Sequence, residues 1–221
     1  MRKLFLFTLT LGLLASCEKE ADPALIDKDS PISSNGYLPL EIGNYWIYQH
    51  VQIDALNNET VIGYVDSMVV DRDTLINGHR YFVIEGTNYP YNSGRWGILD
   101  ILRDSSGYIV THEGGIRFAE DNYSDILAEK TEFIQEDTLY KLTYKMEHVE
   151  GTYTVPAGTF EVNNFKGTVV SYKTLSGIDN PRYLNNLYAK GVGKVMQTYF
   201  FFNHSLISEK RLIRYHVHQG S

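Results

Sequence analysis

The chain of 221 residues has a single cysteine, Cys17. One thiol cannot form an intrachain disulfide, so a small fold held together by disulfides is excluded. A structural free thiol usually lies in a core, whereas Cys17 directly follows an apolar run near the N-terminus. We therefore expect the folded part of the chain to have neither disulfides nor thiol chemistry.

Positive charge is also scarce. Lys and Arg number 20 against 27 Asp and Glu, which gives a net charge of -7, and loss of Arg2 and Lys3 with a cleaved leader would take it to -9. An acidic surface repels phosphate backbones and anionic lipid headgroups. Nucleic acid is therefore excluded as the expected partner.

No hydrophobic run is long enough to cross a bilayer as a helix. The apolar stretch from Leu4 to Leu14 follows Arg2 and Lys3 and ends in small residues, which is the layout of an export signal. Its last residues, Leu14-Ala15-Ser16-Cys17, resemble a bacterial lipobox. The resemblance implies cleavage before Cys17 and acylation of that cysteine, with palmitate among the expected chains. The alternatives are an ordinary secretory signal or an uncleaved anchor.

The residues after Cys17 suggest which membrane would carry the anchor. Glu18 stands where inner-membrane lipoproteins often have aspartate, so the outer membrane is favoured. The run Glu18-Lys19-Glu20 resembles the tethers of surface-exposed lipoproteins of Bacteroidetes, which favours the cell surface over the periplasmic face. Three charged residues are also typical of any solvated tether.

Three regions are expected along the chain. Residues 1–16 form the signal peptide, and residues 17–36 comprise the acylated cysteine and a linker rich in acids, Pro, Ser and Asn with few large apolar groups. Residues 37–221 remain, which suits one domain with a sizeable core.

Short runs rich in Val, Ile, Thr, Tyr and Phe, separated by turn residues, predict antiparallel strands throughout this domain. The predicted strands are Tyr45 to Ile53, Val61 to Asp71, Arg80 to Gly86, Trp96 to Arg103, Tyr108 to His112, Ile116 to Ala119, Thr131 to Gln135, Thr138 to Met146, Thr152 to Val155, Thr159 to Val162, Lys166 to Leu175, Tyr183 to Lys190, Lys194 to Phe202 and Leu206 to His218.

Turn chemistry supports the same interpretation. Asn77-Gly78 is typical of a two-residue hairpin turn, and Ser105-Ser106-Gly107 and Glu113-Gly114-Gly115 predict two further hairpins. Asp121 to Lys130 has helical spacing over barely three turns, so it is either a short helix or an ordered loop.

The strand Lys194 to Phe202 has large apolar side chains on both faces and should be covered twice. We predict one all-β antiparallel domain, either a curved sheet or a half-open or closed barrel, with at most one short helix; a β-sandwich is the alternative.

Two regions resemble uncharacterised lipoproteins and secreted proteins of Bacteroidetes. They are Leu38 to Tyr48, and Val155 to Phe160 together with Ala189 to Val195. The later pair is also similar to β-rich envelope proteins with half-open barrels that hold lipid or act as carriers, which is a likeness of fold only. We favour a structural role for these segments, with Trp46 and Tyr48 as core anchors and with Gly191 and Gly193 in a bulge or a close backbone approach.

Motifs for catalysis, metals and cofactors are weak. Asp71 to Leu75 begins like a calcium loop but has Leu75 in place of a ligand, and His216 and His218 share a strand face near the chain end without a third ligand. No nucleophile motif is present, and Glu41, Asp100, Glu132 and Glu161 are expected to be surface acids. We assign no catalytic residue, metal or cofactor.

Ligand binding without catalysis is the function that the sequence favours, with an apolar, amphipathic or glycan ligand. Tyr89, Tyr91, Trp96 and Tyr108 are the candidate binding residues, because Tyr and Trp offer a stacking face and a polar group. The alternatives are an accessory subunit that binds another envelope protein through a strand edge or aromatic patch, and, less favoured, a hydrolase.

Overall fold

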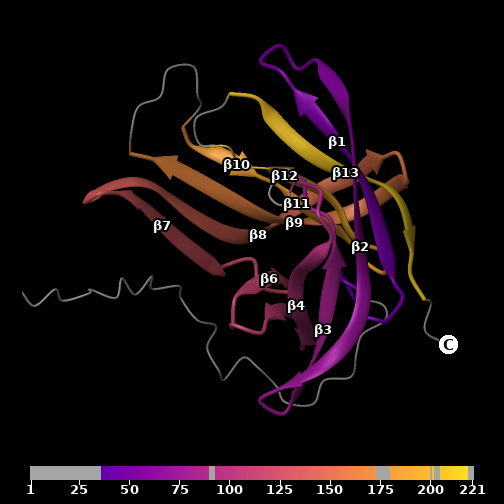
Figure 1. Ribbon diagram of the computed structural model, residues 1–221. Coiled ribbons are helices and arrows are strands. Elements are labelled where there is room, and N and C mark those ends of the chain that lie inside the picture. The colour runs from indigo at the N-terminus through magenta and orange to yellow at the C-terminus, as the bar shows by residue number, and fades with distance from the viewer. Residues whose placement is uncertain (1–35, 90–92, 173–179, 200, 202–204, 219–221) are drawn as a thin grey trace, which may run out of the picture.

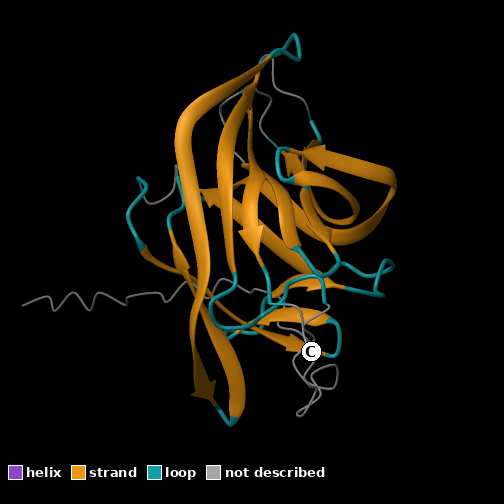
Figure 2. Ribbon diagram, turned by 90° about the vertical axis from the view of Figure 1, so that its right-hand side faces the viewer, coloured by secondary structure: helices purple, strands orange, loops and turns teal. Residues whose placement is uncertain are grey.

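The computed structural model describes residues 36–89, 93–172, 180–199, 201 and 205–218. These residues form one antiparallel sheet of 13 strands that curls into a nearly closed barrel with one unsealed seam. Figure 2 shows only strands and loops among them, with no helix. The prediction of a single all-β domain with a curved or barrel-shaped sheet is confirmed.

The strands differ widely in length. Their bounds are β1 Tyr45–Ile53, β2 Glu59–Ile76, β3 His79–Gly86, β4 Gly97–Ser105, β5 Tyr108–Thr111, β6 Ile116–Ala119, β7 Ala128–Ile134, β8 Asp137–Val155, β9 Gly158–Ser171, β10 Arg182–Leu184, β11 Asn186–Ala189, β12 Gly193–Tyr199 and β13 Ile207–His216.

The sheet is mostly a meander, because neighbours in the chain are usually neighbours in space. Its order is β6-β5-β4-β3-β2-β1-β13-β12-β11-β9-β8-β7, with β10 paired to β9 outside this path. The C-terminal β13 pairs with β1 and joins the two halves (Figure 1). The strands at the two ends of the order, β6 and β7, are not paired with each other, and the seam lies between them.

Residues 121–127 form a loop and β7 begins at Ala128, so the short helix is wrong and the ordered loop is right only as far as Leu127. The Asn122 side-chain oxygen accepts the backbone N–H of Asp125 at 3.2 Å, which is the bond of a helix N-cap, but no helix follows it. The N–H of Leu127 donates to the carbonyl of Tyr144 at 2.9 Å, which draws the end of the loop onto β8.

Some predicted strands join and one divides. Thr138 to Met146 and Thr152 to Val155 belong to the single strand β8, which pairs with β9 across an irregularity between His148 and Thr152. The predicted strand Tyr183 to Lys190 is divided into β10 and β11. A bulge lets one long strand bend without ending, so a break in the sequence pattern of a strand does not always mark a turn.

The hairpin turns are confirmed. Asn77 and Gly78, with φ of 51° and 81°, connect β2 to β3, and Ser106 and Gly107, with φ of 53° and 86°, connect β4 to β5. Positive φ at both central positions matches the right-handed twist of the flanking strands.

Trp46 and Tyr48 anchor the core as predicted, since both are 0% exposed. The Trp46 indole N–H donates to the carbonyl of Val192 at 2.5 Å, and the Tyr48 hydroxyl donates to the carbonyl of Lys194 at 2.8 Å. A Cβ at Gly193 would lie 2.8 Å from the Trp46 indole nitrogen, so only glycine fits there. The segments around residues 46 and 192 therefore lock together two distant parts of the chain.

Strand β12 is buried on both faces, as the sequence predicts. Val195, Met196 and Tyr199 are 0%, 2% and 1% exposed. The last aromatic residues of the predicted strand, Phe200 and Phe202, lie outside the described residues. The side chains of β12 that face inward are the ones that reach the cavities described below.

Candidate functional site

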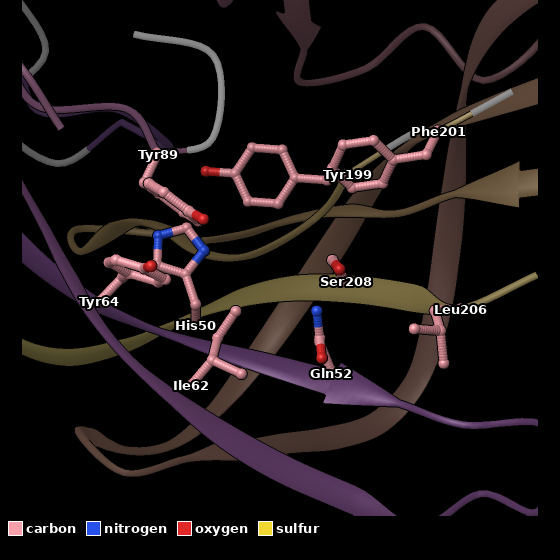
Figure 3. A pocket seen from close by; sticks show the side chains of 9 residues that line it. All are labelled: His50, Gln52, Ile62, Tyr64, Tyr89, Tyr199, Phe201, Leu206 and Ser208. Carbon is pink, nitrogen blue, oxygen red and sulfur yellow. The ribbon is translucent and has the colours of Figure 1, made fainter. Parts of the chain in front are cut away.

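A cleft of about 330 Å³ opens between β1, β2 and the β12–β13 region, and we call it the aromatic cleft. Figure 3 shows its side chains converging from these strands. The lining residues are His50, Gln52, Ile62, Tyr64, Tyr89, Tyr199, Phe201, Leu206 and Ser208. Its volume lies at the lower end of small-molecule pockets.

The aromatic rings of the cleft are arranged in pairs. Tyr64 stacks on Tyr89 with ring centroids 3.7 Å apart, and His50 stacks on Tyr199 at 5.5 Å. The His50 ring meets Tyr89 edge-on at 5.8 Å, which connects the pairs. Tyr64 is 47% exposed and His50 is 1% exposed, so the cleft runs from an open rim to a buried floor.

The floor is held by Asp66, which is 0% exposed. His50 Nε2 lies 2.8 Å from Asp66 Oδ2, and the backbone N–H of Tyr89 donates to Asp66 Oδ1 at 3.0 Å. Burial alone raises the pKa of Asp66, but the hydrogen bonds from His50 and Tyr89 outweigh burial and lower it. Asp66 is therefore a fixed anion that sets the position of His50 and Tyr89.

Ser208, His50 and Asp66 are the residue types of a hydrolytic triad, but their geometry differs from one. Ser208 pairs across the strands with Gln52, not with His50, so the two functional side chains are diagonal neighbours. Within the part of the chain that the structure describes, Ser208 makes no hydrogen bond to His50. An activated serine needs its base within hydrogen-bonding distance, and this arrangement does not supply it.

A second space of about 290 Å³, which we call the interior cavity, lies within the curve of the sheet. Its walls come from both halves of the sheet, and its polar lining includes Asp100, Arg117, Lys194, Gln197 and Lys210. The two spaces are neighbours, since the Lys210 ammonium lies 5.9 Å from the ring centroid of Tyr199.

The structure does not bring the predicted binding residues together. Tyr89 lines the aromatic cleft, whereas Trp96 is 57% exposed and donates to Glu85 at 3.2 Å, away from the cleft. Tyr108 packs against the core and its hydroxyl accepts from Asn122 at 3.1 Å. Tyr91 lies outside the described residues. Ligand binding by these four residues stays a prediction.

The acidic residues considered for catalysis are also dispersed. Glu41 lies before β1, Glu132 on β7 and Glu161 on β9. Asp100 differs from the expected surface acid, because it lines the interior cavity and accepts from Arg117 Nε at 3.1 Å.

The two C-terminal histidines have rings 4.9 Å apart. Over the described ranges, no group of three or more His, Cys, Asp or Glu side chains is placed to hold a metal.

Sequence reasoning missed most residues of both cavities. Lys194 is turned inward by a bulge in β12. Tyr188 pairs with Lys194, but the preceding residue, Leu187, pairs with Met196, so Val195 is an extra residue of β12 without a partner in β11. An extra residue puts Lys194 on the same side as Gln197, contrary to plain alternation. Lys210 could have been found, because it lies two positions before the apolar Leu212 on the same strand face.

No protein-family model and no curated protein matches the sequence. The fold is similar to that of two crystal structures. One is described as a putative exported protein with YmcC-like fold from Bacteroides fragilis, with 15% identity over 82% of this chain and 99% of that one and a TM-score of 0.50. The other is described as a putative lipoprotein from Parabacteroides distasonis, with 16% identity, the same coverage and a TM-score of 0.47. At such identities the likeness concerns the fold alone.

Within the described residues, no helix is long and apolar enough to span a membrane.

Proposed function

We propose that this chain is an envelope lipoprotein that binds a small amphipathic ligand in the aromatic cleft without transforming it. The observation that carries the proposal is the open cleft of about 330 Å³ with a buried polar floor. Ring faces and the apolar side chains of Ile62 and Leu206 would contact the apolar part of a ligand, and the Gln52 amide and Ser208 hydroxyl would contact its polar part.

The lipid anchor belongs to the same proposal. The lipobox-like Leu14-Ala15-Ser16-Cys17 would place acyl chains on Cys17, and the following residues 18–36 would link them to the sheet. The Bacteroides fragilis neighbour is described as a putative exported protein, which supports an envelope location. We place the anchor in the outer membrane and favour the cell surface, because of Glu18-Lys19-Glu20.

The ligand proposal is tested by native mass spectrometry of the lipoprotein, extracted mildly from its own membrane and compared with its denatured mass. We expect a small excess mass that is lost on denaturation. Tyr64→Ala or Tyr89→Ala should reduce the bound fraction by removing the stacked pair. Tyr172→Ala is the matched control, since Tyr172 is 61% exposed and outside the cleft. A bare monomer mass for the native chain and all variants, or an equal loss of bound ligand in the Tyr172→Ala control, would refute binding in the cleft.

The anchor is tested separately by Cys17→Ala. Cells producing this variant should contain unprocessed or released protein, whereas the native chain should be in the membrane fraction with an acylated mature mass. An unchanged mature mass and membrane fraction would contradict acylation at Cys17.

A second candidate is an accessory subunit, because the sheet has two unpaired edges at its seam. Strand β7 also exposes Phe133 and Ile134, which are 58% and 53% exposed. Unpaired edges with apolar side chains can add a strand from another protein. A protein-sized excess mass in the native spectrum would favour this candidate over a small ligand.

A further inference from the structure

The interior cavity is a separate space with unusual chemistry. Its lining residues come from both halves of the sheet. One half contributes β2, β3, β4 and β6, and the other contributes β7, β8, β9, β11, β12 and β13. At roughly 30 Å³ for each non-hydrogen atom, a volume of about 290 Å³ holds about ten such atoms. A small molecule could therefore be enclosed.

Two ammonium groups inside the cavity have no carboxylate partner. Lys210 is 4% exposed, and its Nζ lies 3.9 Å from the Met68 sulfur and 5.0 Å from the Tyr48 ring centroid. Lys194 Nζ donates to the side-chain oxygen of Gln197 at 3.1 Å. Among the described residues, no carboxylate lies within 4 Å of either ammonium. Charges enclosed in this way are costly unless a counter-charge joins them.

The two lysines converge on one place. Gln197 accepts from Lys194 and is the direct cross-strand partner of Lys210. Cross-strand partners have Cβ atoms about 5 Å apart. An anion beside Gln197 could thus reach both ammonium groups at once.

The carboxylates of the region are already bound to other donors. Asp100 accepts from Arg117, and Asp66 accepts from His50 and from the backbone of Tyr89. The remaining titratable side chains that face the two lysines are the tyrosines Tyr48, Tyr144, Tyr188 and Tyr199. Three cationic side chains, Arg117, Lys194 and Lys210, line the cavity with one anionic side chain, Asp100, so the lining has an excess of positive charge that an added anion would reduce.

We propose that the interior cavity binds a small organic carboxylate, with its carboxylate group between the ammonium groups of Lys194 and Lys210. Its apolar part lies against Ile84, Tyr144 and Phe165, which line the same space. This site is distinct from the aromatic cleft and does not depend on ligand binding there.

The seam gives the cavity an entrance. Its lining includes Arg117 of β6 and Ala128 of β7, the strands at the two free ends of the sheet. The Arg117 side chain is 49% exposed, whereas Lys210 is almost fully buried. Cationic groups thus extend from the edge of the seam to the deep end of the cavity, a gradient that attracts an anion inward.

Titration of the lysines supports this assignment and makes it testable. Burial, together with the positive charges of Lys210 and Arg117, lowers the pKa of Lys194 to about 7. Burial, opposed by Asp66, lowers the pKa of Lys210 to about 8. A bound carboxylate favours the charged ammonium, so binding takes up protons near neutral pH and weakens as the pH rises above about 8.

The test compares benzoate with benzamide, a neutral molecule of the same shape, by calorimetric titration of the full-length protein. At pH 7 we expect benzoate to bind at least about tenfold more tightly than benzamide. The benzoate affinity should fall towards pH 9, and buffers of different ionisation enthalpy should reveal proton uptake. Equal affinities for the two probes, or no benzoate binding up to about 10 mM, would overturn the proposal.

Variants locate the binding. Lys194→Met or Lys210→Met should weaken benzoate binding about tenfold and leave benzamide binding unchanged. Lys145 is exposed, so Lys145→Met should change the affinity for neither probe. Unchanged benzoate affinity in both cavity variants would exclude this site. Tyr64→Ala, which alters the aromatic cleft, should leave benzoate binding intact, so failure of one proposal is distinguishable from failure of the other.

Discussion

Lys194→Met should change how the stability of this protein depends on pH. In the folded chain, burial and neighbouring cations lower the pKa of Lys194 to about 7, against about 10.4 in an unfolded chain. Below pH 7 both states hold the proton, and between pH 7 and about 10 the unfolded state holds more. Stability therefore rises with pH in this window.

The magnitude follows from the two pKa values. Between pH 6 and pH 9, Lys194 alone should add about 2–3 kcal/mol to the free energy of unfolding of the native chain. Methionine keeps the unbranched apolar stem but has no proton to lose. Between pH 6 and pH 9 the native chain should therefore gain about 2–3 kcal/mol in free energy of unfolding relative to the variant.

The assay is urea unfolding at pH 6, 7, 8 and 9, followed by tryptophan emission. Lys145→Met is the control, because Lys145 is exposed on β8 and its difference from the native chain should stay flat. Titrating groups that do not interact with Lys194 are common to both chains and cancel in the comparison. Parallel stability curves for Lys194→Met and the native chain would refute the buried, cation-flanked environment of Lys194.

Three further outcomes follow from individual contacts. Gly193→Ala should destabilise the fold by about 2–4 kcal/mol in urea unfolding, because φ is 109° and the new Cβ would contact the Trp46 indole. Gly63→Ala is the control: nothing lies within 4 Å of the new Cβ, so its free energy of unfolding should stay within about 0.5 kcal/mol of the native value. Asp66→Asn should lower stability at pH 7 by about 3 kcal/mol, and the loss relative to the native chain should shrink as the pH falls through the lowered pKa of Asp66. Trp96→Phe should remove most acrylamide-quenchable emission, because Trp96 is 57% and Trp46 is 0% exposed.

The sheet could be predicted from sequence to a large extent. Strand β1 has the predicted bounds Tyr45–Ile53, and Asn77-Gly78 forms the expected turn, because both signals are local. The closure of the sheet by β13 against β1 joins residues more than 150 positions apart, and no local pattern specifies it. Alternation shows which strands have a buried face but not which strands are neighbours.

The candidate site was less predictable than the fold. Tyr89 lines the aromatic cleft, but Trp96 and Tyr108, which share its residue class, lie elsewhere in the tertiary structure. Aromatic residues in strands look alike in sequence whether they face a core, a cleft or solvent. The inward position of Lys194 depends on a bulge, which depends in turn on the pairing of two strands.

The open seam and the charged cavity are linked physically. If β6 and β7 paired, Arg117 and Asp100 would lose contact with water, and every cation of the cavity would become more costly to keep charged. Because the seam stays unsealed, solvent and small solutes have access to a space that the sheet otherwise encloses. The incomplete closure is therefore what allows Lys194 and Lys210 to face inward as binding groups.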